Sequence, residues 1–369
     1  MQEVINELLE TMMSNQVSVP AIQPVIDMAA QMPMVGLGIS FILWTPIFAL
    51  LICPGLSTLG IFLLFFPWIE RKLCGRIQWR VGPREIVPWL GGLIQLLADT
   101  LRFLFQEVIV HKDAHRPYFL QFAFLSFAAA LLPLLFINAG AVIAIASPYG
   151  VQLLLALVCL FPLFILGLGW ASNSRFAFIG SVREAFMYFA YEIPFIIAVL
   201  AMVILFGTSN PLLIPDKWGI ILNPIAAFTF FVGAAMATSR MPFEIPEADQ
   251  EVAAGPHVEY SGIAFGLIYV MCYEKAYILS TLMVVLFLGG GSGPDIPGLT
   301  VHLGDLMGIV WFLIKVIIVM TTMFVLRTIY PRYRLDQGLT IGWGAMIAIS
   351  LVALAWSIVF VFMQQGGIL

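Results

Sequence analysis

Apolar runs long enough to cross a lipid bilayer follow one another along most of this chain of 369 residues. A helix needs about 20 such residues to span a hydrocarbon core about 30 Å thick. Eight stretches meet that length, at 36–69, 118–138, 151–171, 185–206, 221–240, 262–288, 306–329 and 340–363. The short alternating segments of a membrane β-barrel are not found in the sequence. We therefore predict an all-α polytopic membrane protein with about eight transmembrane helices.

The first run is longer than one crossing requires. Its 34 residues would extend about 50 Å as a helix, at about 1.5 Å per residue. The segment is then steeply tilted, kinked near Pro54, or divided into two short spans. We favour one long tilted helix, because this choice also gives a consistent orientation of the chain.

Lysine and arginine predict that orientation. In the eight-span model, 14 of the 17 basic residues fall on one side of the membrane: Arg71, Lys72, Arg76, Arg80, Arg84, Arg102, Lys112, Arg116, Arg175, Arg183, Arg240, Arg327, Arg332 and Arg334. Basic residues are typical of cytoplasmic loops. The pattern predicts a multi-pass protein of the cell inner (plasma) membrane with both termini outside the cytoplasm.

Two amphipathic segments are predicted to lie at the membrane surface. "MQEVINELLETMM" belongs to an N-terminal extracytoplasmic segment, 1–33, and a single transmembrane helical domain covers 34–369. In 90–107, Gln95, Asp99, Arg102 and Gln106 form one polar stripe on an apolar helix. This stripe faces either protein or a water-filled chamber, or it simply faces water at the membrane surface.

Three ionisable residues lie well inside predicted spans: Glu274 and Lys275 in the sixth, and Lys315 in the seventh. A charge at the centre of a membrane helix costs about 2.5–3.5 kcal/mol on insertion scales, so partners or water are expected. Two hypotheses fit, a fixed Glu-Lys pair that holds helices together and a proton relay through a titrating carboxylate.

The fourth span begins with two carboxylates and two phenols on one helical face. Glu184, Tyr188, Tyr191 and Glu192 occupy positions i, i+4, i+7 and i+8. Such a strip favours a hydrated path, and a polar seam between neighbouring helices is the structural alternative.

The stretch "MPFEIPEADQEVAAGPHVEY", 241–260, collects acids in a chain that is only 10% charged. These acids are Glu244, Glu247, Asp249, Glu251 and Glu259. Like charges in proximity raise one another's pKa, so some of these acids are expected to hold a proton near neutral pH. Apolar and stiff residues between them predict that the loop packs back into the protein.

Cysteine and histidine spacing predicts no metal site. The four cysteines are scattered, and His111 and His115 have no third or fourth ligand nearby in the sequence. No nucleotide-binding motif is present. We expect no metal, no cofactor bound by this chain alone and no nucleic-acid partner.

Four ordered motifs resemble a membrane subunit family of respiratory complex I, known as the H subunit in bacteria and as NADH dehydrogenase subunit 1 in mitochondria. These motifs are "WIERKLCGRIQWRVGP" followed by "LADTLRFLFQE", "GWASNSRFAFIGSVREAFMYFAYEIP", "RMPFEIPEADQEVAAGPHVEYSG" and "LRTIYPRYRLDQ". They are spread from about 60 to 345, nearly the whole chain.

The resemblance implies a subunit of a proton-translocating NADH:quinone-type oxidoreductase that has no redox centre of its own. It implies a chamber for a lipid-soluble quinone or analogous carrier, with Glu70, Arg71, Asp99 and Arg102 in matching positions. A proton relay is implied by the acids that match the family motifs: Glu192, Glu247, Asp249, Glu251 and Glu259, which Glu184 and Glu244 join in our proposal. The implied partners are antiporter-like membrane subunits, soluble iron-sulfur subunits docked on the cytoplasmic loops, and lipid.

Several positions depart from the family pattern. "FEIPEAD" stands for the usual "FDLPEAE" and keeps its charges, so the relay hypothesis is unaffected. "AGPHVEY" stands for "AGYHTEY", Arg102 stands where lysine is common, and Gln106 also replaces a usual lysine. These changes leave open the details of the carrier pocket and the identity of the carrier.

Three alternative functions fit part of the same sequence pattern. The membrane subunit of an energy-converting hydrogenase would keep the architecture and need no quinone chamber. A free-standing ion transporter would not need the two arginine-rich loops, and a passive anchor would not need the buried charges. The electron donor, whether NADH, deazaflavin or ferredoxin, depends on other subunits, and the sequence does not select between proton and sodium.

Overall fold

The computed structural model describes residues 15–20, 23–24, 39, 41–84, 87–140, 142–214, 217–294 and 303–365. Within these ranges the protein is helical, and its only β-pairings are two isolated bridges. In the part of the chain that the structure describes, seven helical segments are long and apolar enough to cross a membrane, and an eighth apolar helix is shorter. The predicted fold class is confirmed. The predicted N-terminal surface helix at residues 1–13 lies outside the described residues.

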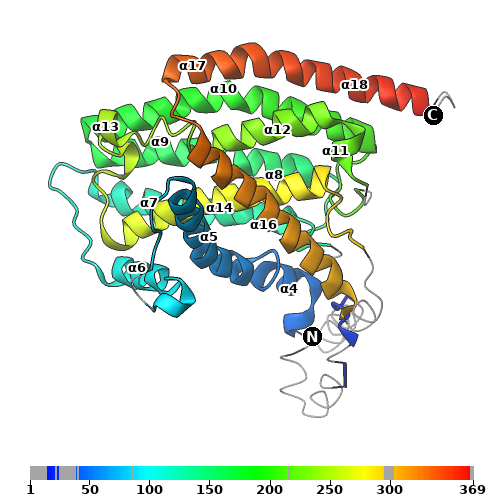
Figure 1. Ribbon diagram of the computed structural model, residues 1–369, viewed down its shortest axis with the longest axis horizontal. Coiled ribbons are helices and arrows are strands. Elements are labelled where there is room, and N and C mark those ends of the chain that lie inside the picture. Colours follow the sequence, from blue (N-terminus) through cyan, green and yellow to red (C-terminus); the bar gives the residue numbers. More distant parts are fainter. Residues whose placement is uncertain are drawn as a thin grey trace, which may run out of the picture.

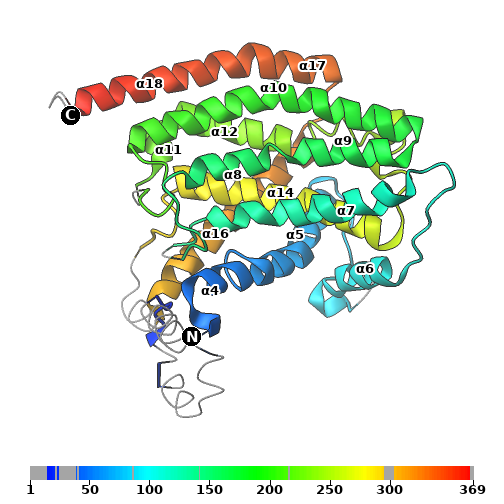
Figure 2. The ribbon, with the colours of Figure 1, turned by 180° about the vertical axis from the view of Figure 1, so that it is seen from behind.

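The helices run mostly side by side in one bundle (Figures 1 and 2). The spanning segments contain α4 (Thr45–Leu51) and α5 (Leu56–Ile77), α7 (Arg116–Leu131), α8 (Gly150–Val158) and α9 (Phe161–Ser172), α10 (Arg175–Phe206), α14 (Gly262–Phe287), α16 (Asp305–Ile329), and α17 (Leu335–Thr340) with α18 (Ile347–Gln365). The shorter elements are α6 (Ile94–Phe105), α11 (Gly219–Leu222), α12 (Pro224–Ala237) and α13 (Asp249–Val252), with short 3₁₀ turns at Pro88–Leu90, Leu132–Phe136 and Gly255–His257. A π-helical stretch, Ile341–Met346, joins α17 to α18.

The first span is interrupted at Pro54, as one of the sequence hypotheses proposed. α4 ends at Leu51 and α5 begins at Leu56, and together they form one candidate span. α5 continues beyond the predicted end of the span at 69, because Glu70 and Arg71 find partners within the protein. The first two residues of the predicted chamber therefore lie on a rigid helix.

Two predicted boundaries were wrong. α10 begins at Arg175 rather than at 185, since Arg183 and Glu184 form ion pairs and do not end the helix. α12 covers Pro224–Ala237, less than the predicted 221–240. Its start is capped by Asn223, whose side chain accepts a hydrogen bond from the amide of Ala226.

α14 is the central helix of the bundle, drawn in yellow in Figure 1. It packs against α5, α6, α7, α12 and α16, and 89% of its most apolar 18-residue window is buried inside the protein. The corresponding value for the α17–α18 segment is 22%, because this segment packs mainly along α10 at one side. Most side chains of α14 therefore face other parts of the protein rather than lipid.

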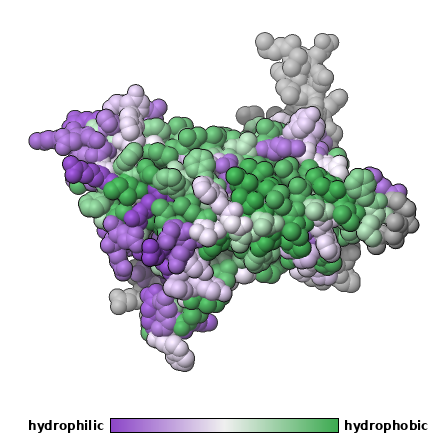
Figure 3. All heavy atoms as spheres, turned by 90° about the horizontal axis from the view of Figure 1, so that it is seen from above, coloured by the Kyte–Doolittle hydropathy of each residue, from purple (hydrophilic) through white to green (hydrophobic). Residues whose placement is uncertain are grey.

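Hydrophilic side chains gather toward one end of the molecule, and hydrophobic side chains cover its middle (Figure 3). The connections between α5 and α7, between α9 and α10, between α12 and α14, and between α16 and α17 lie toward this end (Figures 1 and 2). These connections and the adjoining helix ends contain the 14 basic residues that the sequence analysis placed on one side.

Candidate functional site

An apolar cavity of about 550 Å³ lies between α5, α6 and α14. Its walls are formed mainly by aliphatic and phenyl groups: Leu63, Leu64, Leu96, Leu97, Phe103, Leu104, Ile263, Phe265, Leu267 and Val270. Polar groups are few and come from Arg71, Asp99, Thr100, Tyr269 and Tyr273. A concave apolar site with a few polar groups is the usual form of a small-molecule site.

The helix α6 closes this cavity as an amphipathic element. Asp99 on α6 pairs with Arg71 on α5, with 3.0 Å between Oδ2 and Nη1. On α14, a Cβ at Gly266 would lie 3.1 Å from the Cβ of Phe103, so the missing side chain allows a close approach of α6. Asp99 of the predicted polar stripe thus faces protein and the cavity, whereas Arg102 is exposed and does not line it.

Glu70 lies next to the cavity at the centre of a buried polar cluster. Its carboxylate accepts a hydrogen bond of 2.7 Å from the hydroxyl of Tyr273, which lines the cavity. Arg240 donates to both carboxylate oxygens, at 2.9 and 3.1 Å, and Arg327 pairs with Oε1. The hydroxyl of Tyr269, also in the cavity wall, is 3.1 Å from that of Tyr273. Two arginines on one carboxylate give the cluster an excess of positive charge.

A second buried cluster contains Glu184. Lys275 Nζ lies 3.2 Å from Glu184 Oε1 and donates to the carbonyl of Ala237 at 2.8 Å. Ser239 donates to the other oxygen of Glu184 at 2.6 Å. All three side chains in this cluster are buried.

A Glu-Lys pair does hold helices together, but its acid is Glu184 on α10 and not Glu274. Successive residues on a helix point about 100° apart, and Lys275 points to Glu184. Among the described residues, the buried oxygens of Glu274 have no hydrogen-bond partner. Lys315 instead caps the end of α14, because its Nζ donates to the carbonyls beyond that helix, those of Leu288, Gly290 and Ser292.

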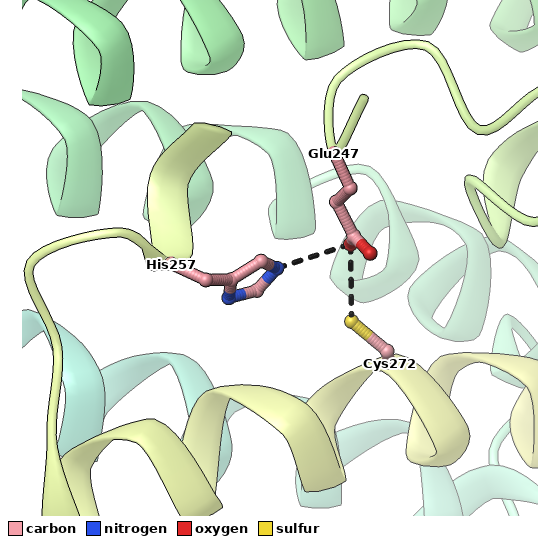
Figure 4. A group of neighbouring side chains, drawn as sticks. All are labelled: Glu247, His257 and Cys272. Carbon is pink, nitrogen blue, oxygen red and sulfur yellow. Dashed lines mark hydrogen bonds and ion pairs between the residues drawn. The ribbon is translucent and has the colours of Figure 1, made fainter. Parts of the chain in front are cut away.

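The loop after α12 folds back into the protein, as its apolar residues predicted. Glu247 Oε1 lies 3.1 Å from His257 Nε2 and 3.7 Å from Cys272 Sγ on α14 (Figure 4). Burial by itself would raise the pKa of Glu247 and lower that of His257. Their mutual attraction outweighs burial only together with the charges of Arg240 and Lys275 near Glu247 and with the contact of Cys272 to His257. The pKa of Glu247 is therefore below its ordinary value and the pKa of His257 is above it.

Glu244 is an acid of this loop whose pKa is raised. Burial and the nearby charge of Glu247 raise the pKa of Glu244 to about 7. One carboxylate oxygen is buried without a hydrogen-bond partner among the described residues, and the other lies 3.8 Å from Arg327. At neutral pH this carboxyl group is thus near half protonation.

The remaining predicted acids occupy two other environments. Glu251 is at the surface and pairs with Arg183 and Arg332, which lower its pKa. Asp249 is exposed at the start of α13, and Glu259 is half-buried. On α10, Tyr188 donates a hydrogen bond to Glu192, so these two members of the predicted strip interact directly.

Several site residues escaped the sequence analysis. Tyr269, Tyr273, Ser239 and Arg327 complete the two buried clusters, and they come from α14, from the segment after α12 and from the end of α16. Only the i, i+4 spacing of Tyr269 and Tyr273 on a predicted span could have indicated a polar face.

Comparison with known proteins gives consistent matches. The model of the NADH dehydrogenase family matches residues 50–358. The NADH-quinone oxidoreductase H subunit of Geobacillus sp. (strain WCH70) is 35% identical over 289 residues, 77% of this chain and 84% of the relative. The second such H subunit of Rhizobium meliloti (strain 1021) is 35% identical over 308 residues, 77% and 88%. The H subunit of Dehalococcoides mccartyi (strain CBDB1) is 32% identical over 295 residues, 79% and 80%.

Proposed function

This chain belongs to the NADH dehydrogenase family that includes the H subunit of NADH-quinone oxidoreductase, and from this premise we propose that its apolar cavity receives the lipid-soluble carrier. The chain is a membrane subunit of a complex I-type oxidoreductase. The names of its relatives favour this function over the hydrogenase alternative, because each relative is named for quinone.

The shape and chemistry of the cavity support a quinone as the carrier. The aliphatic and aromatic wall suits an isoprenoid tail, and Tyr269, Tyr273, Arg71 and Asp99 provide donors and acceptors for a polar head. We assign the head to the polar side of the cavity, next to the Glu70 cluster.

We propose that the two buried clusters couple electron transfer to ion translocation. One observation supports this assignment above the others: two consecutive residues join the clusters, since Arg240 binds Glu70 and Ser239 binds Glu184. A charge change at the cavity that moves Arg240 would therefore disturb the Glu184 pair. Arg240 also interacts electrostatically with Glu247, so the loop acids belong to the same network.

The proposed sequence of events starts with reduction of the carrier. A reduced quinone takes up protons, and each proton drawn from the cluster changes the charge that Arg240 and Arg327 experience. Glu244, with a pKa of about 7, exchanges protons at neutral pH at low cost. The change in charge then acts on the ion pair of Glu184 with Lys275, and along α10 on Tyr188 and Glu192. The solvent-facing end of the proposed relay contains the other acids of the loop, Glu251, Asp249 and Glu259.

The polar end of the molecule is our proposed docking face for the soluble iron-sulfur subunits. Trp79 is 97% exposed and Trp89 is 84% exposed in the loops after α5, among several basic residues. Exposed aromatic residues and arginine are enriched at protein interfaces. We assign this end to the cytoplasm, which leaves the termini on the other side. The apolar face of α18 is available for lipid or for antiporter-like subunits.

A cavity-filling variant tests the proposed site. Leu64→Trp places a larger side chain in the cavity wall and should raise the KM for a soluble quinone analogue by about tenfold or more, which corresponds to about 1.4 kcal/mol. Phe228→Trp is the matched control, since Phe228 is exposed on α12, away from the cavity. An unchanged KM in an assembled Leu64→Trp complex would contradict the proposal.

A further inference from the structure

Glu247, His257 and Cys272 bring three potential metal ligands to one point (Figure 4). They come from the loop after α12, from the following 3₁₀ turn and from α14. The three ligand atoms lie within 4.8 Å of one another. The three residues are spread over 26 positions of the chain without a recognised ligand spacing, so the sequence pattern predicted no metal site.

Both separations that involve Glu247 are close to those around a tetrahedral zinc ion. Zinc lies about 2.0–2.2 Å from nitrogen and oxygen ligands and about 2.3 Å from sulfur. At tetrahedral angles this gives about 3.3 Å between nitrogen and oxygen and about 3.6 Å between oxygen and sulfur. The observed values are 3.1 Å from His257 to Glu247 and 3.7 Å from Glu247 to Cys272. The third separation, between His257 and Cys272, is no more than 4.8 Å.

A cavity next to the three residues can hold a fourth ligand. Its volume is about 10 Å³, and Glu247, His257 and Cys272 are among its lining residues. This volume is close to that of a single water molecule. Three protein ligands and one water are a common zinc arrangement.

The ligand types and the local charge select the class of metal ion. A thiolate and a carboxylate supply two negative charges, which balance a divalent cation. Thiolate and imidazole together favour zinc, whereas Mg²⁺ and Ca²⁺ require oxygen ligands. The nearby cations Lys275 and Arg240 are already paired with Glu184 and Glu70.

We propose that Glu247, His257 and Cys272 form a zinc-binding site between the acidic loop and α14. Binding forms bonds from zinc to the carboxylate, the imidazole Nε2 and the thiolate, and the protons of Cys272 and His257 pass to solvent. The ion ties the loop to the central helix and holds Glu247 in place.

Alkylation of cysteines in the purified complex, freed of metal with a chelator, tests the site. Zinc at ten times its Kd should slow alkylation of Cys272 by about tenfold, because only the unoccupied fraction reacts. Cys74 at the end of α5 is an internal control whose rate should not change, since it has no part in the cluster. Mass spectrometry of the peptides gives both rates in one sample, and Mg²⁺ should protect neither cysteine.

Two variants identify the other ligands. His257→Gln and Glu247→Gln should each lose the protection of Cys272 at the same zinc concentration. Equal protection in these variants, or no protection in the wild-type complex, would overturn the proposed site.

The consequence for the reaction rests on the proposed function. If Glu247 takes part in coupling, zinc should inhibit carrier reduction in the wild-type complex, and Cys272→Ala should remove this inhibition while leaving Glu247 in place. Protection of Cys272 without any inhibition would support the zinc site and contradict the role of Glu247 in coupling, so the two failures are distinguishable.

Discussion

Lys275 on α14 forms its ion pair with Glu184 on α10, 3.2 Å away, and not with the adjacent Glu274. Both partners are buried, and each also has a hydrogen bond from or to the segment that ends α12. The pair therefore joins three helices near the middle of the molecule. Removing either charge leaves the other buried without a counter-charge.

This arrangement predicts a rescue by double substitution. Glu184→Gln and Lys275→Met should each destabilise the protein by about 3–5 kcal/mol, the usual cost of breaking a buried ion pair. The double variant should lose less than the sum of the single losses, because no uncompensated charge remains. Thermal inactivation of the purified complex compares the stability of the wild type, the two single variants and the double variant. Strictly additive losses would show that the pair contributes nothing to stability.

The hydroxyl of Tyr273 should be important for carrier reduction. Tyr273→Phe removes a hydrogen bond of 2.7 Å to Glu70 at the wall of the cavity. Hydrogen bonds to charged groups contribute about 1.5–3 kcal/mol, so kcat/KM for the quinone should fall about tenfold or more. Tyr260→Phe is the control, since its hydroxyl binds the carbonyl of Leu168 away from the cavity. Equal losses in the two variants would argue against a specific role of Tyr273.

Glu244 should titrate near neutral pH. Burial and Glu247 raise its pKa to about 7, so the carboxyl group is protonated below that pH and ionised above it. Infrared difference spectra should contain a protonated carboxyl band that disappears as the pH rises through about 7, and Glu244→Gln should lack it. Glu251→Gln should retain the band, because the paired arginines keep the pKa of Glu251 low.

The same raised pKa affects stability. Between the ordinary pKa of a glutamate and about 7, the folded protein binds more protons at Glu244 than the unfolded chain. Stability should therefore decrease as the pH rises through this window, and Glu244→Gln should reduce that slope. A slope unchanged by the substitution would assign the pH dependence to another group.

Substitution of Asp99 should weaken binding of the carrier more than it lowers the stability of the protein. Asp99 and Arg71 are both more than a third exposed, and exposed ion pairs contribute about 0–1 kcal/mol to stability. Asp99→Asn should leave the thermal midpoint almost unchanged and raise the KM for the quinone, since Asp99 lines the cavity. A large loss of stability with an unchanged KM would reverse this assignment.

The sequence by itself determined the helical class, the order of the spans and the location of the acidic loop. Apolar length and the position of basic residues carry this information, because a bilayer requires internally hydrogen-bonded segments of a minimum length. Arg71 and Asp99 form an ion pair and both line the cavity, whereas the polar stripe by itself left open whether it faces protein or water. Their roles in the reaction stay predictions.

Only the tertiary structure decided which charges are partners. Lys275 could have paired with Glu274 next to it or with an acid on another helix, and helix rotation together with the packing of α10 against α14 selected Glu184. The grouping of Glu247, His257 and Cys272 has the same origin, since the loop must fold back before the three atoms meet. Such contacts depend on the relative placement of whole helices, which the spacing of residues along one helix does not encode.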